Sequence, residues 1–119
     1  MNCIEIHTSQ DGHSHFRSVR TFEVSPMLFA GTTVLLSQPT RCESTLVHEF
    51  DADYRMSWHN PPSTQYVIVL AGELEIAVHG GASRRFAEGA MFIAADLTGT
   101  GHTTHALKAG HAVVINLGA

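Results

Sequence analysis

From Trp58 to Gly72 the chain reads W-H-N-P-P-S-T-Q-Y-V-I-V-L-A-G. A proline-rich turn leads into an apolar run that ends at a glycine, which is typical of a buried strand. His59 and Gln65 have the same parity, and on extended chain such residues point to one face. Buried polar atoms without partners cost roughly 1–3 kcal/mol each. An inward-facing polar pair therefore predicts a bound partner, and a metal ion is the sharpest candidate.

Short apolar segments separated by turns continue on both sides of this stretch. The alternation of Glu73–Val78 predicts carboxylates facing water and Leu74, Ile76 and Val78 facing a core. Only Ser25–Ala30 allows a helical turn, with Ser25 as N-cap and Pro26 at the first helical position. The predicted fold class is all-β, a small sandwich or barrel with at most this short helical turn. The predicted strands cover residues 34–37, 43–50, 66–70, 73–79, 90–94 and 112–117.

The composition favours one ordered domain over residues 1–119. Residues 1–15 are polar and rich in histidine, which suggests an N-terminal arm. A net charge of −4 without a basic stripe argues against nucleic acid as a partner. Residues 1–10 contain no apolar run for a signal peptide or a membrane span. We therefore expect the protein to bind no membrane. Two cysteines do not make a disulfide framework, so we expect a cytoplasmic location.

The region from Trp58 to His105 resembles a cupin, the small jelly-roll barrel also called a double-stranded β-helix. In the first cupin motif, His59 takes the first histidine position, Pro61 the second, Gln65 the glutamate position and Gly72 the final glycine. Asp53 takes the place of the opening glycine.

The second cupin motif begins at Gly89, and Ala95 takes its proline position. His102 is its histidine, two residues late, so the loop 96–101 carries an insertion. The W-H pair, the run from Gln65 to Glu75 and the D-L-T-G-T-G-H loop are also similar to a group of small bacterial cupins without an assigned function.

The resemblance implies a divalent transition metal inside the barrel, held by His59, Gln65 and His102, with His105 as a substitute ligand. Imidazole suits Zn, Fe, Ni or Mn. Pro61 removes one of the usual ligands, and Gln65 adds no negative charge. The alternative is a metal-free pocket in which the two histidines bond to Gln65, water or an organic anion.

Asp96 and His105 are the candidate catalytic residues. Asp96 begins the inserted loop, where its carboxylate either caps the loop or orients the imidazole of His102 through its second nitrogen. The parity of Trp58 and Tyr66 places them outside the pocket, on a surface that suits a homodimer of the kind the cupin resemblance implies.

Two functions follow from these features. The first is a metal-dependent enzyme acting on a small polar organic molecule, of the isomerase, lyase, cyclase or oxygenase type. The second is a module that binds a small molecule without turnover.

Overall fold

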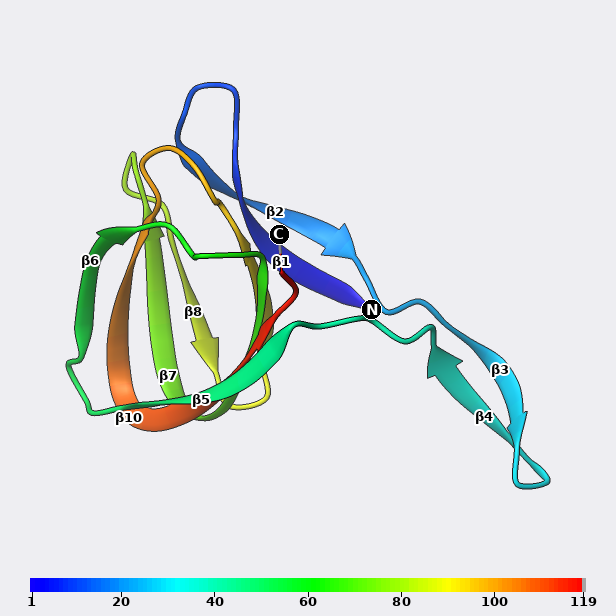
Figure 1. The fold of residues 1–119 in the computed structure, drawn as a ribbon. Helices are drawn as coiled ribbons and strands as arrows, with labels where there is room; N and C mark the ends of the chain where they lie inside the picture. The colour runs from blue at the N-terminus through cyan, green and yellow to red at the C-terminus, as the bar shows by residue number, and fades with distance from the viewer. Residues whose placement is uncertain (119) are drawn as a thin grey trace.

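Two long strands form the frame of the barrel. The computed structural model describes residues 1–118, and in it β7 (Gln65–Val78) pairs antiparallel with β10 (His102–Asn116) (Figure 1). Each long strand has one partner along its first part and another along its second, so both pass between the two sheets of a jelly roll. These partners are β5 (Ser44–Phe50), β6 (Arg55–His59), β8 (Ser83–Ala87) and β9 (Met91–Ala95).

Gly72 marks the bend of the long strand β7. The sequence predicts a turn between two strands here, but the structure has one continuous strand. Gly72 has a φ of +86°, and a Cβ on it would lie 2.6 Å from the carbonyl oxygen of Ala109 in β10. Glycine thus lets the two strands approach closely at the corner of the barrel.

The core lies between the sheets and follows the predicted alternation. Leu74, Ile76 and Val78 are buried, which confirms that their strand turns its apolar face inward. The first half of β7 adds Val67 and Val69 to the same cluster. Residues 1–118 form strands and no helix, which confirms the all-β fold class. No helix of this described part of the chain is long and apolar enough to cross a membrane.

The N-terminal residues belong to the main sheet. β1 (Asn2–Thr8) runs parallel to β9 and antiparallel to β2 (Ser14–Arg20). Ile6 of β1 is completely buried, and Ile4 packs against the core. The predicted arm over residues 1–15 is therefore wrong, because polar and histidine-rich composition hid a short period-two pattern.

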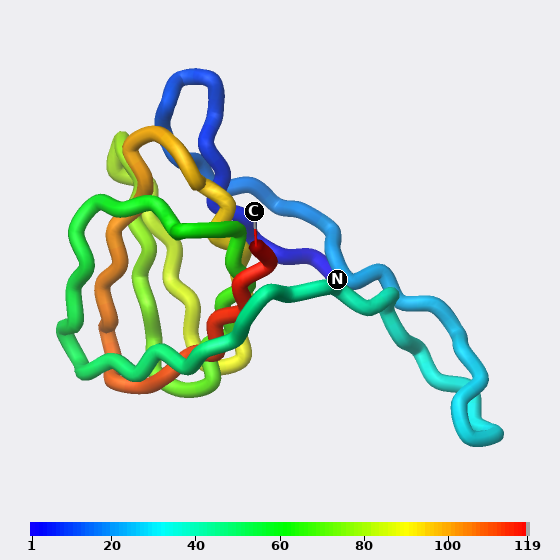
Figure 2. The backbone as a smooth tube through the Cα atoms, in the orientation of Figure 1, coloured from blue at the N-terminus to red at the C-terminus, as the bar shows by residue number. Residues whose placement is uncertain are grey.

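A hairpin projects from the barrel between β2 and β5. It projects away from the barrel (Figure 2) and consists of β3 (Val24–Phe29) and β4 (Thr32–Ser37), which pair with each other and with no other strand of residues 1–118. The two turn residues, Ala30 and Gly31, both have positive φ, which a type I′ hairpin turn requires. The predicted helical turn over Ser25–Ala30 is thus wrong, because this turn pairs the segment as a strand.

Candidate functional site

A cavity of about 410 Å³ enters the barrel and is lined by residues of β5, β6, β7, β9 and β10. Its walls are largely apolar, with Val67, Leu74, Ile76 and Phe92 among them. The polar side chains of His59, Gln65 and His102 line the same cavity. The structure therefore brings the three predicted ligand residues to one place.

His59 and His102 are neighbours across the pairing of β6 with β10. Their ring centroids lie 4.4 Å apart, with one ring edge facing the other ring. His102 is only 4% exposed, whereas His59 is half-buried. The two imidazoles form a close pair on the wall of the cavity.

The backbone sets the tautomer of His59. Its Nδ1 donates to the carbonyl oxygen of Ser57 at 2.7 Å, and a carbonyl can only accept, so Nε2 carries the free lone pair. Burial lowers the pKa of His59 below its ordinary 6.5. The bond to Ser57 opposes this shift, His102 adds to it, and Asp96 opposes it. His59 is therefore a neutral acceptor at pH 7.

This lowered pKa predicts a pH dependence of stability. Above 6.5 the imidazole is neutral in both folded and unfolded chains. As the pH falls below 6.5, the unfolded chain takes up the proton first, so the free energy of unfolding decreases until the folded pKa is passed. Urea unfolding at several pH values should show this loss in wild type and less of it in His59→Gln. An equal slope in both proteins would contradict the assignment.

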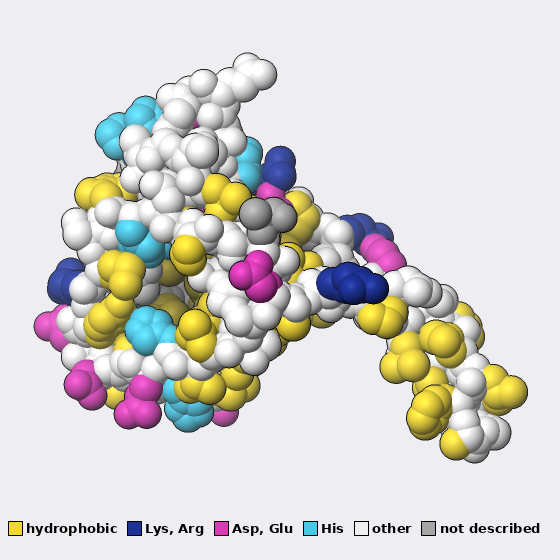
Figure 3. Space-filling model, viewed as in Figure 1, with side chains coloured by type: hydrophobic (Ala, Val, Ile, Leu, Met, Phe, Trp, Pro, Cys, Tyr) yellow, Lys and Arg dark blue, Asp and Glu magenta, His cyan; other side chains and the backbone are white. Residues whose placement is uncertain are grey.

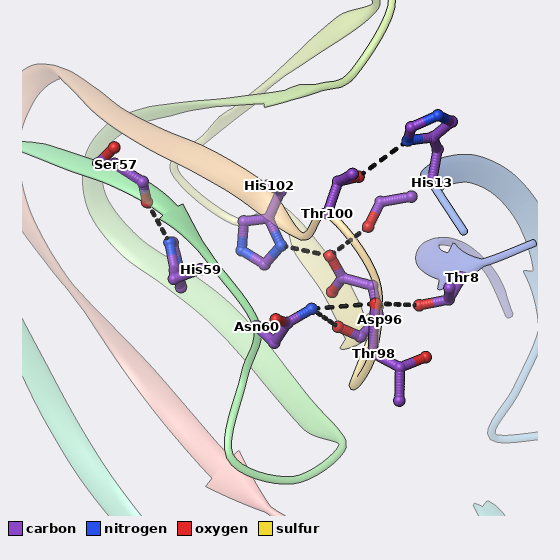
Figure 4. Close-up of polar contacts among 10 residues, drawn as sticks. Thr8, His13, Ser57, His59, Asn60, Asp96, Thr98, Thr100 and His102 are labelled. Carbon is purple, nitrogen blue, oxygen red and sulfur yellow. Dashed lines mark hydrogen bonds and ion pairs between the residues drawn. The ribbon is translucent and has the colours of Figure 1, made fainter. Parts of the chain in front are cut away.

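Behind His102 lies a buried hydrogen-bonded chain. The Nδ1 of His102 donates to Oδ2 of Asp96 at 2.7 Å, and the hydroxyl of Ser14 donates to the same oxygen at 2.7 Å (Figure 4). Asp96 and Ser14 are both fully buried. Of the two roles predicted for Asp96, the structure shows the orientation of His102 through its second ring nitrogen.

The other carboxylate oxygen of Asp96 is an unusual group. Oδ1 is buried and has no hydrogen-bond partner within residues 1–118. Leaving a buried polar atom unpaired costs roughly 1–3 kcal/mol. A buried carboxylate with one unpaired oxygen, placed behind an imidazole that lines a cavity, is typical of a functional site.

The inserted loop that carries Asp96 is anchored on two sides. The side-chain nitrogen of Asn60 donates to the carbonyl oxygens of Asp96 and Thr98, at 2.9 and 3.0 Å. From the N-terminal sheet, the hydroxyl of Thr8 donates to the same Thr98 oxygen at 2.8 Å (Figure 4). These bonds hold the loop in the position that orients His102.

Gln65 contributes a carbonyl oxygen to the cavity. Its side-chain nitrogen donates to Oδ1 of Asn116 at 2.9 Å, which leaves its amide oxygen as an acceptor. Within residues 1–118, no group of three or more histidine, cysteine, aspartate or glutamate side chains could hold a metal ion. The three predicted ligand residues thus offer two imidazoles and one carboxamide along the wall of the cavity.

The structure does not bring His105 into the site. On β10, His102 and Thr104 line the cavity. His105 is adjacent to Thr104 in the strand, so its side chain points to the opposite face. Its Nε2 lies 2.8 Å from the exposed carboxylate of Asp53. That bond, followed by the charge of Arg55, lowers the pKa of Asp53.

Trp58 and Tyr66 lie outside the cavity, as their parity predicts. Trp58 is half exposed, and Tyr66 packs edge to face against Phe22.

Sequence reasoning missed Ser14 and Asn60. No local pattern connects Ser14 with Asp96, 82 residues away. The link depends on the pairing of the N-terminal strands with β9. Asn60 directly follows His59 and precedes two prolines. This position in a turn beside a motif histidine was the one sign in the sequence that its amide could have a role in the site.

Comparison with known proteins identifies the fold. The chain is similar to an RmlC-like cupin protein from Desulfovibrio desulfuricans, with 19% identity, a TM-score of 0.51 and coverage of 79% of each chain. An RmlC-like cupin from Shewanella frigidimarina gives 15% identity and a TM-score of 0.52 over 97% of this chain and 85% of that one. This chain has the cupin fold.

A further similar structure has no assigned function. It is a conserved protein from Streptococcus pyogenes, with 21% identity, a TM-score of 0.55 and coverage of 71% of this chain and 70% of that chain. No family model matches the sequence, and no curated protein matches it. At these identities the comparisons establish the fold, and the chemistry must be argued from the site.

Proposed function

We propose that this cupin binds a small organic molecule in the barrel cavity and exchanges a proton with it through His102. The observation that carries the proposal is the buried chain from Ser14 through Asp96 to His102, which ends at the cavity beside His59. A histidine oriented by a buried carboxylate is a recurrent arrangement for general acid–base chemistry.

The lining of the cavity defines the class of ligand. Its volume of about 410 Å³ lies within the range of small-molecule pockets. Apolar walls meet polar groups near His59, Gln65 and His102. This arrangement suits a molecule with an apolar body and a polar head that carries a carbonyl, hydroxyl or carboxylate group.

The two histidines have different roles in this proposal. The Nδ1 proton of His102 stays on its bond to Asp96, so Nε2 accepts a proton from the ligand and the carboxylate stabilises the resulting imidazolium. The same proton returns to the ligand at the original atom, which is exchange, or at a neighbouring atom, which is chemistry of the isomerase type. Neutral His59 accepts a hydrogen bond from the polar head.

Deuterium exchange provides the test. Small hydroxy acids, keto acids and aldoses are screened by thermal shift, and each molecule that binds is incubated with the protein in D₂O. NMR should show loss of a ligand C–H signal with wild type and not with His102→Gln. The exposed residue His111 gives the control variant His111→Gln, which should behave as wild type. Binding without exchange would favour the module without turnover, and unchanged exchange in His102→Gln would overturn the proposal.

Metal binding is a second candidate, favoured by the geometry of the histidine pair. The ring centroids of His59 and His102 lie 4.4 Å apart, and Nε2 of His59 carries a free lone pair, so this pair could supply two nitrogen ligands to one ion. His59, His102 and the amide oxygen of Gln65 fit a weakly held ion, since no anionic ligand is among them. A bound ion would supply Lewis acidity that polarises a carbonyl or carboxylate.

Elemental analysis separates the two candidates. Protein purified without a histidine tag or chelators should contain stoichiometric metal if this second candidate holds, and His59→Ala should lose it. Gln65→Leu should weaken metal affinity by at most about 10–100-fold, the loss found when a residue that supports the metal ligands is removed. Sub-stoichiometric metal in wild type would rule out the second candidate, and the proton-transfer proposal would be the one that remains.

A further inference from the structure

A second, more open cavity lies between β2 and the turn that joins β7 to β8. It has a volume of about 700 Å³, and His15 and Phe16 of β2 line it opposite residues of the segment 78–85. Both sides are free edges, because β2 pairs only with β1 and β8 pairs only with β7 among the described strands. This cavity shares no lining residue with the cavity inside the barrel, so it is a separate place for a ligand.

Histidine and arginine side chains line this second cavity. His15, His79, Arg84 and Arg85 are among its lining residues, and no aspartate or glutamate of residues 1–118 is. In Figure 3, histidine side chains lie at the upper end of the barrel, near the turns that follow β1 and β7. The whole chain has a net charge of −4. A lining whose ionisable groups are all basic therefore differs from the average surface of this protein, and it favours an anionic ligand.

The guanidinium of Arg84 is held over an aromatic ring. Arg84 pairs with the buried Ile76 across β8 and β7, so the two side chains lie on the same face of the sheet. Its guanidinium carbon lies 5.8 Å from the centroid of the Phe16 ring, which is within the range of a cation–π contact. Nε of Arg85 donates to Oε2 of Glu75 at 3.3 Å, whereas Arg84 pairs with no carboxylate of residues 1–118. Phe16 thus positions a positive charge that the described chain does not neutralise.

Two imidazoles beside the arginines are also held in fixed positions. Nε2 of His15 lies 2.8 Å from Oδ2 of Asp11, so this carboxylate directs the ring. The ring of His79 stacks on the ring of His13, with centroids 4.1 Å apart and planes 8° apart. Ser83 adds a hydroxyl group to the same lining. Polar groups that are ordered before a ligand arrives reduce the entropy cost of binding it.

This combination of side chains is typical of a site for a phosphate group. Arginine binds phosphate through two parallel N–H···O bonds, and imidazole and hydroxyl groups can supply further bonds to its remaining oxygens. A metal ion does not account for the cluster, because no three metal-binding side chains of residues 1–118 are grouped for one. The volume is that of a pocket for a small organic molecule, and the ring of Phe16 offers an apolar wall.

We propose that the cavity between β2 and the β7–β8 turn binds the phosphate group of a small organic molecule, and that Arg84 is the residue that holds this group. The site would serve a second ligand of the protein, beside the molecule bound inside the barrel. Because the two cavities share no lining residue, the experiment below does not depend on the proton-transfer proposal.

Titration with inorganic phosphate at constant ionic strength tests the proposal. NMR signals of the His15 and His79 rings and of the Arg84 Nε–H should move together, with a dissociation constant of about 1 mM or less. Arg84→Gln should weaken the affinity at least about tenfold, as for a lost hydrogen bond between charged groups. Arg84→Lys keeps the charge without the paired N–H groups and should recover part of the loss. Arg41→Gln removes an exposed arginine that does not line the cavity and should bind as wild type.

A second titration distinguishes the sources of the phosphate group. Ribose 5-phosphate should bind more tightly than inorganic phosphate, and Phe16→Ala should reduce this advantage; equal affinities would assign the site to free phosphate. No saturable shift up to about 10 mM phosphate would overturn the proposal. Equal phosphate affinity in wild type and Arg84→Gln, with the native fold of both confirmed by circular dichroism, would overturn it too. Acetate bound as tightly as phosphate would contradict it in favour of a carboxylate ligand.

Discussion

Gly101→Ala should destabilise this protein by roughly 2–4 kcal/mol and move His102 away from His59. Gly101 directly precedes His102 and has a φ of +74°. A Cβ there would clash with the backbone carbonyl of His59. Because the pairing of β6 with β10 fixes both backbones, neither can move without breaking the contact that joins the two histidines. Urea unfolding measures the stability, and NMR signals of the two rings report their separation.

Gly80→Ala is the matched control. Gly80 has a φ of +93°, and a Cβ on it would meet no atom within 4 Å. It carries the cost of a left-handed backbone, about 1–2 kcal/mol for a residue other than glycine, without a clash. A loss in Gly80→Ala as large as that in Gly101→Ala would show that the close approach to His59 adds nothing.

The fold was predictable where apolar residues follow one clear period. Glu73–Val78 alternate cleanly, and the inward side chains are those that the alternation selects. Two of the failures have clear physical causes. In β1, polar neighbours mask the pair Ile4 and Ile6, and burial comes from pairing with a strand almost 90 residues away. In β3, Ser25 followed by Pro26 has the pattern of a helix N-terminus. The hairpin turn at Ala30 and Gly31 instead pairs this segment with β4 as a strand.

Only the site residues that belong to a cupin motif could be predicted from the sequence. The cupin motifs identified His59 and His102, and Asp53 at the usual glycine position has a φ of +69°, which glycine adopts without strain. The inserted loop obscured which histidine of β10 faces the cavity, and only the register shows that His105 does not. Ser14 could not be found, because its contact depends on tertiary structure.

Asp96→Asn should slow deuterium exchange into a bound ligand by about 100-fold or more while the cavity keeps its shape. The amide has nearly the size of the carboxylate, but it removes the negative charge that stabilises a proton on His102. Its carbonyl can still accept one hydrogen bond, so ligand affinity should change much less than the exchange rate. The downfield Nδ1–H resonance of His102 should shift, since its acceptor is no longer charged.

Two further variants decide whether this effect belongs to the site. Ser14→Ala removes one neutral hydrogen bond to Asp96, so its effect on exchange should be about tenfold or less. Asp53→Asn makes the same chemical change in a carboxylate that bonds to His105 outside the cavity, and exchange should stay at the wild-type rate. Equal slowing in Asp53→Asn and Asp96→Asn would mean that total charge matters and that the buried chain behind His102 does not. Wild-type exchange in Asp96→Asn would show that proton transfer does not depend on the carboxylate behind His102.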